Sequence, residues 1–200
     1  GLYLQALIDR SQGLSARPRD RRRIVQLFTA RLQTELQTEV EAAQTIREQF
    51  QQSVIALEHA LQDGTAWSEF MQMALDRLAA LPGVKAAALG APDANGEFVV
   101  ELSSGLETYA RAMKKHYGGI KVPKLQGAHA ESLGPTATAW QTEKISTLAS
   151  YAHDTPGAPW REAAGDAGIR SAASVPLTDR NGRVVVILSL YGGYPAMFER

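Results

Sequence analysis

The feature that most constrains the fold is a pair of strand-like stretches near the end of the sequence, Ser171–Leu177 and Arg183–Tyr191. The turn between them, Asp179–Gly182, supplies residues that tolerate positive φ. The second stretch is apolar at odd and even positions alike, with Val184, Val186 and Leu188 expected on one face and Val185, Ile187 and Ser189 on the other. Apolar side chains on both faces predict a central strand that is covered by protein on both sides.

The middle of the chain predicts a second hairpin and several helices. Val84–Gly90 and Glu97–Ser103 have the composition of strands, and the loop between them contains Gly96 in the position expected for a hairpin. The other predicted elements are helices over 66–81, 106–117, 134–142 and 161–167, with a short strand over 144–149. Thr65 is expected to cap the helix that begins at Ala66. Hairpins favour antiparallel pairing, so the predicted class is α+β, a central antiparallel sheet of five or six strands with helices on both faces.

The N-terminal part, residues 1–64, is expected to be a helical region that precedes a domain over 65–200. Leu2–Ile8 predicts a short helix, and Asp20–Leu61 contains neither proline nor glycine. Apolar residues recur three and four apart, as in a coiled-coil seam, at Leu36, Val40, Ala43, Phe50, Val54, Leu57 and Leu61. At about 1.5 Å per residue this helix would reach about 60 Å, too long to bury its stripe on one small domain. We therefore expect a homodimer through this helix, weakened by charges at Leu57 and Leu61.

Composition limits the chemistry that the chain can perform. Its 21 basic and 21 acidic residues give a net charge of zero, so no nucleic-acid partner is expected. The sequence has no cysteine, which excludes disulfides, thiolate catalysis and zinc–sulfur sites. No apolar run approaches the ~20 residues of a membrane helix, so we expect no membrane insertion and a cytoplasmic location. Because the chain starts with Gly1, we also expect it to be part of a longer protein.

Five short motifs follow one another in the second half of the sequence. They are Gly134–Trp140, Lys144–Asp154, Pro159-Trp160-Arg161, Gly168-Ile169-Arg170-Ser171 with Val175-Pro176-Leu177, and Asn181-Gly182-Arg183 followed by Val184–Leu190. In this order they resemble the GAF domain, a sensory module of bacterial signalling proteins, over about 65–200. Tyr194–Arg200 is similar to the start of the family's closing helix, with Phe198 as its opening phenylalanine.

The resemblance implies a small-molecule sensor that has no catalytic residues of its own and controls an output domain outside this chain. The ending LSLYGGYPAMFE resembles GAF domains that precede cyclic-di-GMP synthesis or degradation domains, and a histidine kinase is the alternative output. A second alternative is a ligand-free module that only dimerises and transmits. GAF enzymes that reduce free methionine sulfoxide work through cysteines, so the cysteine-free sequence excludes that activity.

The resemblance also implies where a ligand would bind. Four aromatic residues occur in segments that line the family's cavity, although core packing is the alternative for each: Tyr109, Trp140, Tyr151 and Trp160. Arg170 and Ser174 belong to the strand below that cavity, and His116 and His153 flank it. Some GAF domains bind haem through a histidine, so an axial ligand among the four histidines is a further alternative to ordinary surface roles: His59, His116, His129 and His153. No metal site is predicted, and the sequence leaves the identity of any cofactor open.

Overall fold

The computed structural model describes residues 18–124 and 130–199, and contacts divide the chain into two units, 1–48 and 49–200. The expected helix Leu2–Ile8 and the candidate ligand His129 lie outside the described residues. The contact boundary, at 48/49, lies within the long helix, sixteen residues before the predicted domain boundary at 64/65.

The predicted long helix is α2, Pro18–Gln62, which has 45 residues. It begins at Pro18, since proline fits the first turn of a helix, where its missing N–H removes no hydrogen bond. Pairs four residues apart support its exposed surface, for example Gln44 Nε2 donating to Glu48 Oε1 at 3.1 Å. Gly64, with φ of +72°, ends the helix. Within the described residues, no helix is long and apolar enough to cross a membrane.

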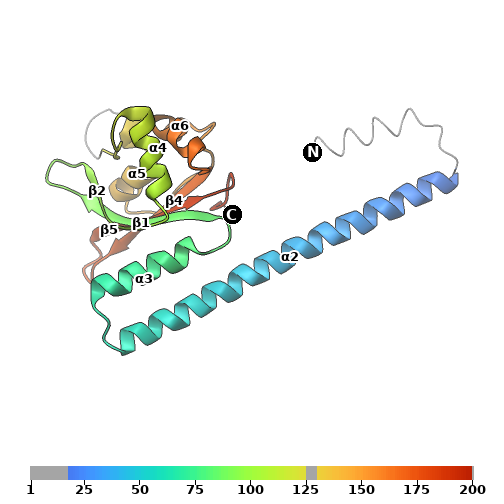
Figure 1. Ribbon diagram of the computed structural model, residues 1–200, viewed down its shortest axis with the longest axis horizontal. Helices are drawn as coiled ribbons and strands as arrows, with labels where there is room; N and C mark the ends of the chain where they lie inside the picture. The colour runs from blue at the N-terminus through green and yellow to red at the C-terminus, as the bar shows by residue number, and fades with distance from the viewer. Residues whose placement is uncertain (1–17, 125–129, 200) are drawn as a thin grey trace. The chain divides into compact units, whose positions relative to one another are not determined.

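The second unit is built on one antiparallel sheet of five strands, in the order β2-β1-β5-β4-β3 (Figure 1). The strands are β1 Val84–Pro92, β2 Phe98–Ser104, β3 Ser146–Leu148, β4 Ser171–Thr178 and β5 Val184–Gly192. The most apolar stretch of the sequence, β5, lies at the centre between β1 and β4. The α+β class, the antiparallel sheet and the central position of β5 are confirmed.

Two hairpin turns of the sheet repeat one sequence pattern, Asp-x-Asn-Gly, at Asp93–Gly96 and Asp179–Gly182. In each turn the aspartate Oδ1 accepts from the backbone N–H groups two and four residues later, at 2.8 and 2.9 Å for Asp93 and at 2.8 and 3.0 Å for Asp179. These bonds lower the pKa of both carboxyl groups. The glycines have φ of +74° and +80°, which explains why the pattern requires them.

Helices cover the two faces of the sheet in different ways (Figure 1). One face packs against α3, Trp67–Ala79, through leucines and alanines that include Leu75, Ala87 and Leu89. The other face lies under three helices: α4 Glu107–Tyr117, α5 Pro135–Thr142 and α6 Arg161–Asp166. Two 3₁₀ turns, Ala130–Leu133 and Thr155–Trp160, complete that layer. The sheet therefore has one face with a single helix and one face with a mixed cover.

Three details differ from the sequence prediction. Val184 packs with Phe98 and Ile187 instead of sharing a face with Val186, because the β4–β5 register shifts between Leu177 and Thr178. Thr65 does not cap α3; the residue before the helix is Ala66, and no described side chain forms a cap bond there. After β5 the described residues form turns up to Phe198 instead of the start of a helix.

Candidate functional site

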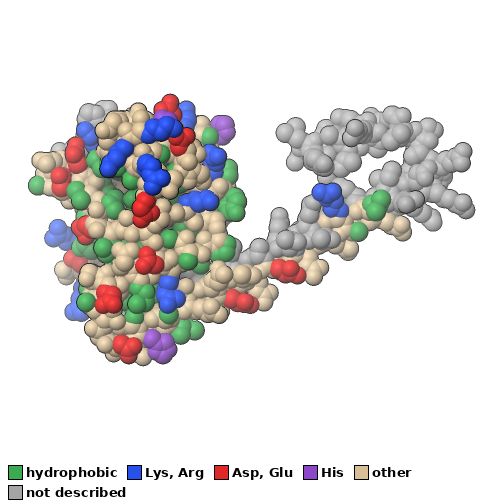
Figure 2. Space-filling view, viewed as in Figure 1, with side chains coloured by type: hydrophobic (Ala, Val, Ile, Leu, Met, Phe, Trp, Pro, Cys, Tyr) green, Lys and Arg blue, Asp and Glu red, His purple; other side chains and the backbone are tan. Residues whose placement is uncertain are grey.

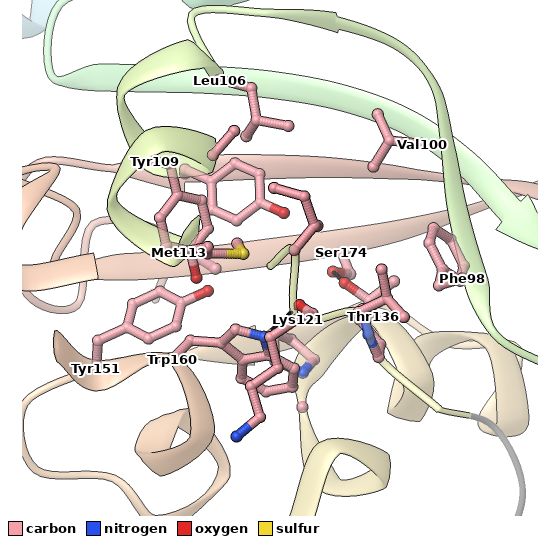
Figure 3. A pocket seen from close by; sticks show the side chains of 18 residues that line it. Phe98, Val100, Leu106, Tyr109, Met113, Lys121, Thr136, Tyr151, Trp160 and Ser174 are labelled. Carbon is pink, nitrogen blue, oxygen red and sulfur yellow. Dashed lines mark hydrogen bonds between the residues drawn. The ribbon is translucent and has the colours of Figure 1, made fainter. Parts of the chain in front are cut away.

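A cavity of about 70 Å³ lies on the face of the sheet that α4, α5 and α6 cover, which we call the cavity face. It is enclosed by the sheet, α4, α5 and the segment 120–123 (Figure 3). One water molecule needs a cavity volume of about 10–15 Å³, so this cavity has room for several waters or for one compact ligand. Val100 and Ile120 line it and are 43% and 48% exposed, which places its opening on their side. A second cavity of about 30 Å³ shares Phe98, Thr136 and Tyr191 with it.

Aromatic rings from several elements form part of the wall. Tyr109 comes from α4, Tyr151 from the loop after β3, Trp160 from the turn before α6, and Tyr191 from β5. The rings of Tyr109 and Tyr191 lie 5.6 Å apart with a tilt of 60°. The indole Nε1 of Trp160 donates to the carbonyl of Lys121 at 2.8 Å, so its hydrogen-bonding capacity is used within the wall. These rings present flat apolar surfaces to the cavity.

Three buried hydroxyl groups meet on the sheet side of the cavity. Thr136 on α5 lies 3.2 Å from Ser174 on β4 and 3.3 Å from Ser189 on β5, measured between the hydroxyl oxygens. Ser174 and Ser189 are paired residues in the β4–β5 register, with oxygens 3.4 Å apart. We call these three residues the hydroxyl cluster. Its members are 7%, 1% and 4% exposed, so it is a polar group enclosed by protein.

The tyrosine hydroxyls of the wall are held in the neutral form. Removal from water raises the pKa of Tyr109 and Tyr151 well above the ordinary value, and it raises the pKa of Tyr191 to about 12. Figure 3 shows the hydroxyls of Tyr109 and Tyr151 close to one another on the side of the cavity away from Ser174. Near neutral pH each of these groups can donate one hydrogen bond and accept others.

The beginning of α5 contributes to the cavity through Gly134, Pro135 and Thr136. No side chain within the described residues caps this helix. Its first-turn N–H groups, those of Thr136 and Ala137, have no carbonyl within the helix to bind. A Cβ on Gly134 would lie 2.8 Å from the Trp160 ring, so only glycine lets the helix start so close to the wall.

Among the described residues that line the cavity, one is charged, Lys121. Its Nζ lies 3.2 Å from Glu131 Oε1 and 5.1 Å from the centre of the Tyr117 ring. Figure 3 shows the Lys121 side chain extending away from the hydroxyls of Thr136 and Ser174. The charge therefore belongs to an ion pair at the rim of the cavity.

The structure brings together four of the eight residues that the sequence predicts to bind a ligand: Tyr109, Tyr151, Trp160 and Ser174 all line the cavity. Their binding role stays a prediction. Trp140 packs beside the cavity, against Phe98 and Ile187, and is not part of its lining.

The other three candidates lie elsewhere. His116 Nε2 is 2.8 Å from Asp166 Oδ2, so it joins α4 to α6. His153 is exposed in the loop after β3. Arg170 is exposed immediately before β4, where its backbone N–H donates to Gly192 O at 2.7 Å.

Sequence reasoning missed several residues of the two cavities, above all Thr136 and Tyr191, which line both, and Ser189, which lines the smaller one. A signal for two of them was available, since Ser189 and Tyr191 alternate with leucines along β5 and so share the face opposite to Leu188 and Leu190. Thr136 had no such signal, because its position depends on how α5 docks on the sheet.

The described residues do not fit haem. His59 is exposed on α2, and neither His116 nor His153 lines the cavity. A volume of about 70 Å³ is also far too small for a porphyrin. No group of three or more metal-ligating side chains occurs in the part of the chain that the structure describes.

The chain belongs to the GAF domain family, whose model matches residues 64–199. It is therefore a regulatory sensory module. No curated protein matches the chain.

Two solved structures illustrate the likeness. The free methionine-R-sulfoxide reductase of Neisseria meningitidis, in complex with its substrate, has a TM-score of 0.52 at 17% identity and covers 72% of each chain. The A. aeolicus nlh2 GAF domain in an inactive state has a TM-score of 0.51 at 13% identity, covering 73% of this chain and 80% of that chain. At such identities the likeness shows the fold alone.

Proposed function

We propose that this GAF domain senses a small molecule in the cavity between α4, α5 and the sheet. The observation that carries the proposal is the combination of open volume, aromatic walls and an enclosed hydroxyl cluster on one face of the sheet. Pockets for small molecules typically combine apolar walls with a few well-placed polar groups. Ligand binding would shift the population of two arrangements of the domain toward the one that binds better.

The output of the sensor is proposed to be a change in the packing of α2 against the same helix of a second copy. Two positions of the apolar seam have described side chains, Val54, which is 38% exposed, and Leu57. The adjacent Ile55 is 53% exposed, so this part of α2 presents apolar surface that a second copy could cover. The proposed output domain makes or degrades cyclic-di-GMP, in the cytoplasm, with a histidine kinase as the alternative.

The chain itself is proposed to be non-catalytic. The absence of cysteine supports this, because the thiol chemistry of the reductases that share the fold is not available to it. The even mixture of acidic and basic side chains over the face of the domain in Figure 2 supports a small-molecule ligand over a nucleic acid.

Thermal-shift measurements on the 200-residue chain test the sensing role. We expect at least one member of a panel of amino acids, nucleotides and uncharged aromatic compounds to raise the melting temperature, since a ligand stabilises the state that binds it. The variant Ala110→Leu adds bulk to the cavity lining and should abolish that shift without lowering the melting temperature of the free protein. Ala94→Leu, in an exposed turn, is the matched control. A panel without any effect would favour the ligand-free module.

Light scattering tests the dimer. The wild-type chain should have the mass of two copies, and Val54→Glu together with Leu57→Glu should shift it toward one copy, since two charges would be buried in the seam. Gln52→Glu, at an exposed position outside the apolar stripe, adds a charge away from the seam and should leave the mass unchanged. A wild-type monomer at micromolar concentration would contradict the proposal.

A further inference from the structure

We propose that the cavity selects an uncharged molecule that carries a hydroxyl, carbonyl or amide oxygen, and that it rejects ions of the same shape. This inference rests on the proposed sensing role and names the class of ligand for it.

The first argument comes from charge. No carboxylate lines the cavity within the described residues, so a cationic ligand would find no counter-charge there. Lys121, the one charged residue among the described residues of the lining, is paired with Glu131 at 3.2 Å and turned toward the rim (Figure 3). An anion would therefore be enclosed without a free cationic partner. Burial of an unpaired ion is unfavourable by far more than burial of a neutral polar group.

The second argument comes from the tyrosines. A tyrosinate could serve as a counter-charge for a cation, but burial holds Tyr109 and Tyr151 in the protonated form. Their hydroxyls then offer hydrogen bonds and no net charge. The hydroxyls of Tyr109 and Tyr151 bond to each other, and because a hydroxyl can both donate and accept, the pair can also bond to the oxygen of an alcohol, an amide or a ketone.

The third argument comes from the hydroxyl cluster. Its three oxygen–oxygen distances, 3.2 to 3.4 Å, are longer than the 2.7–2.8 Å of good O–H···O bonds, so its internal bonds are weak. A ligand oxygen that approaches Thr136 and Ser174 can replace them with shorter bonds. The uncapped start of α5, which holds Thr136, adds backbone N–H groups in the same place; these would also attract an anion, so the comparison with benzoate is the most demanding part of the test.

These groups define the shape of the ligand. Its oxygen lies at the hydroxyl cluster, and a flat apolar body lies between Trp160 and the tyrosine rings of the wall. Benzamide and benzyl alcohol have this form. Benzoate and benzylammonium match them closely in shape and differ in charge.

Titration of the 200-residue chain with these four probes, followed by NMR chemical shifts of backbone amides, tests the inference. We expect each neutral probe to bind at least about tenfold more tightly than its charged counterpart, a difference of about 1.4 kcal/mol. The shifted signals should include those of residues 134–137 and of β4 and β5.

Variants of the cluster sharpen the test. Ser174→Ala and Thr136→Val should each weaken benzamide binding several-fold, and Thr136→Ser, which keeps the hydroxyl, should restore most of it. Thr142→Val, an exposed threonine of the same helix, is the matched control and should bind as the wild type does. The melting temperature of each variant shows whether it is folded, and the Thr136→Ser comparison holds even if Thr136→Val is not.

The possible outcomes separate this inference from the proposed function. If benzoate or benzylammonium binds as tightly as the neutral probes, the selection of uncharged ligands is wrong and the sensing role stands. If benzamide binds equally well to Ser174→Ala and Thr136→Val, the cluster is not the binding group. If none of the four probes binds and the broader panel has no effect either, both proposals fail.

Discussion

The two faces of the sheet differ although the same strands build both. On β5, Leu188 and Leu190 pack toward α3, whereas Ser189 and Tyr191, which alternate with them, face the other side, where Tyr191 lines both cavities and Ser189 lines the smaller one. On β4, Leu177 packs toward α3, and Ala172 and Ser174 line the cavity. Alternation along a strand thus places aliphatic packing on one side and hydrogen-bonding chemistry on the other.

The contrast teaches where stability and function reside in this domain. The α3 face is filled mainly by leucines and alanines, with Met71 and Val186 packed among them. The cavity face combines aromatic rings, hydroxyls and unfilled volume, which contribute less packing per residue. We therefore expect substitutions on the α3 face to change mainly the free energy of unfolding, and substitutions on the cavity face to change mainly binding.

The largest expected effect is on the α3 face. Leu75→Ala removes a side chain that is 1% exposed at the centre of the leucine cluster, and it should lower the free energy of unfolding by about 2–5 kcal/mol. Ser174→Ala, also 1% exposed but on the cavity face, should lower it by about 1 kcal/mol or less, because its hydrogen bonds are long. Urea denaturation of both variants measures the difference. Equal losses would break the contrast between the faces.

The next effect concerns the wall of the cavity. Gly134→Ala places a Cβ 2.8 Å from the ring of Trp160, which must move, so we expect a loss of about 1–3 kcal/mol and weaker ligand binding. Gly165→Ala is the matched control, because a Cβ there meets nothing within 4 Å and alanine favours helix α6. Thermal melting should show the first variant below the wild type and the second at or above it.

Alkaline pH should destabilise the folded domain through the buried tyrosines of the cavity face. Tyr109 and Tyr151 ionise near pH 10 in the unfolded chain but have a raised pKa in the folded one. Above pH 10 the unfolded chain therefore binds fewer protons, and each of these tyrosines should lower the free energy of unfolding by about 1.4 kcal/mol per pH unit. Their stabilising contribution is fully present below pH 10 and is lost as the pH rises through the folded pKa.

Denaturation at a series of alkaline pH values measures this slope. Tyr151→Phe removes one ionising hydroxyl, so its slope should be shallower by about one proton. A variant with the slope of the wild type would show that Tyr151 already ionises normally in the folded domain.

The sequence predicted the sheet well because the evidence for it is local. Period-two alternation on β5 and the Asp-x-Asn-Gly turns at 93–96 and 179–182 depend on neighbouring residues alone. The error at Val184 arose at a register shift between β4 and β5, which a strict alternation cannot represent.

The site was predicted only in part, because its geometry depends on contacts distant in sequence. The partner of His116 is Asp166, 50 residues later, so a histidine predicted to flank a ligand instead joins two helices. Thr136 meets Ser174 and Ser189, which are 38 and 53 residues away. Tyr109, Tyr151, Trp160 and Ser174 were found because the family resemblance supplied the docking that local patterns lack.

The smallest expected effect concerns how the cavity cover is held together. Asp166 on α6 lies 2.7 Å from Lys115 Nζ and 2.8 Å from His116 Nε2 on α4, and both contacts lower its pKa. The resulting stabilisation is present above the ordinary aspartate pKa and is lost as the pH falls through the lower folded value. Asp166→Asn should lower the melting temperature by roughly 1–3 °C in low salt and by less in high salt, since exposed ion pairs are weak and screened.

Asp76→Asn, on the exposed side of α3, is the matched control and should show no such salt dependence. If both variants respond to salt alike, the ion pairs do not hold α4 to α6, and apolar packing accounts for the cover of the cavity face as it does for the α3 face.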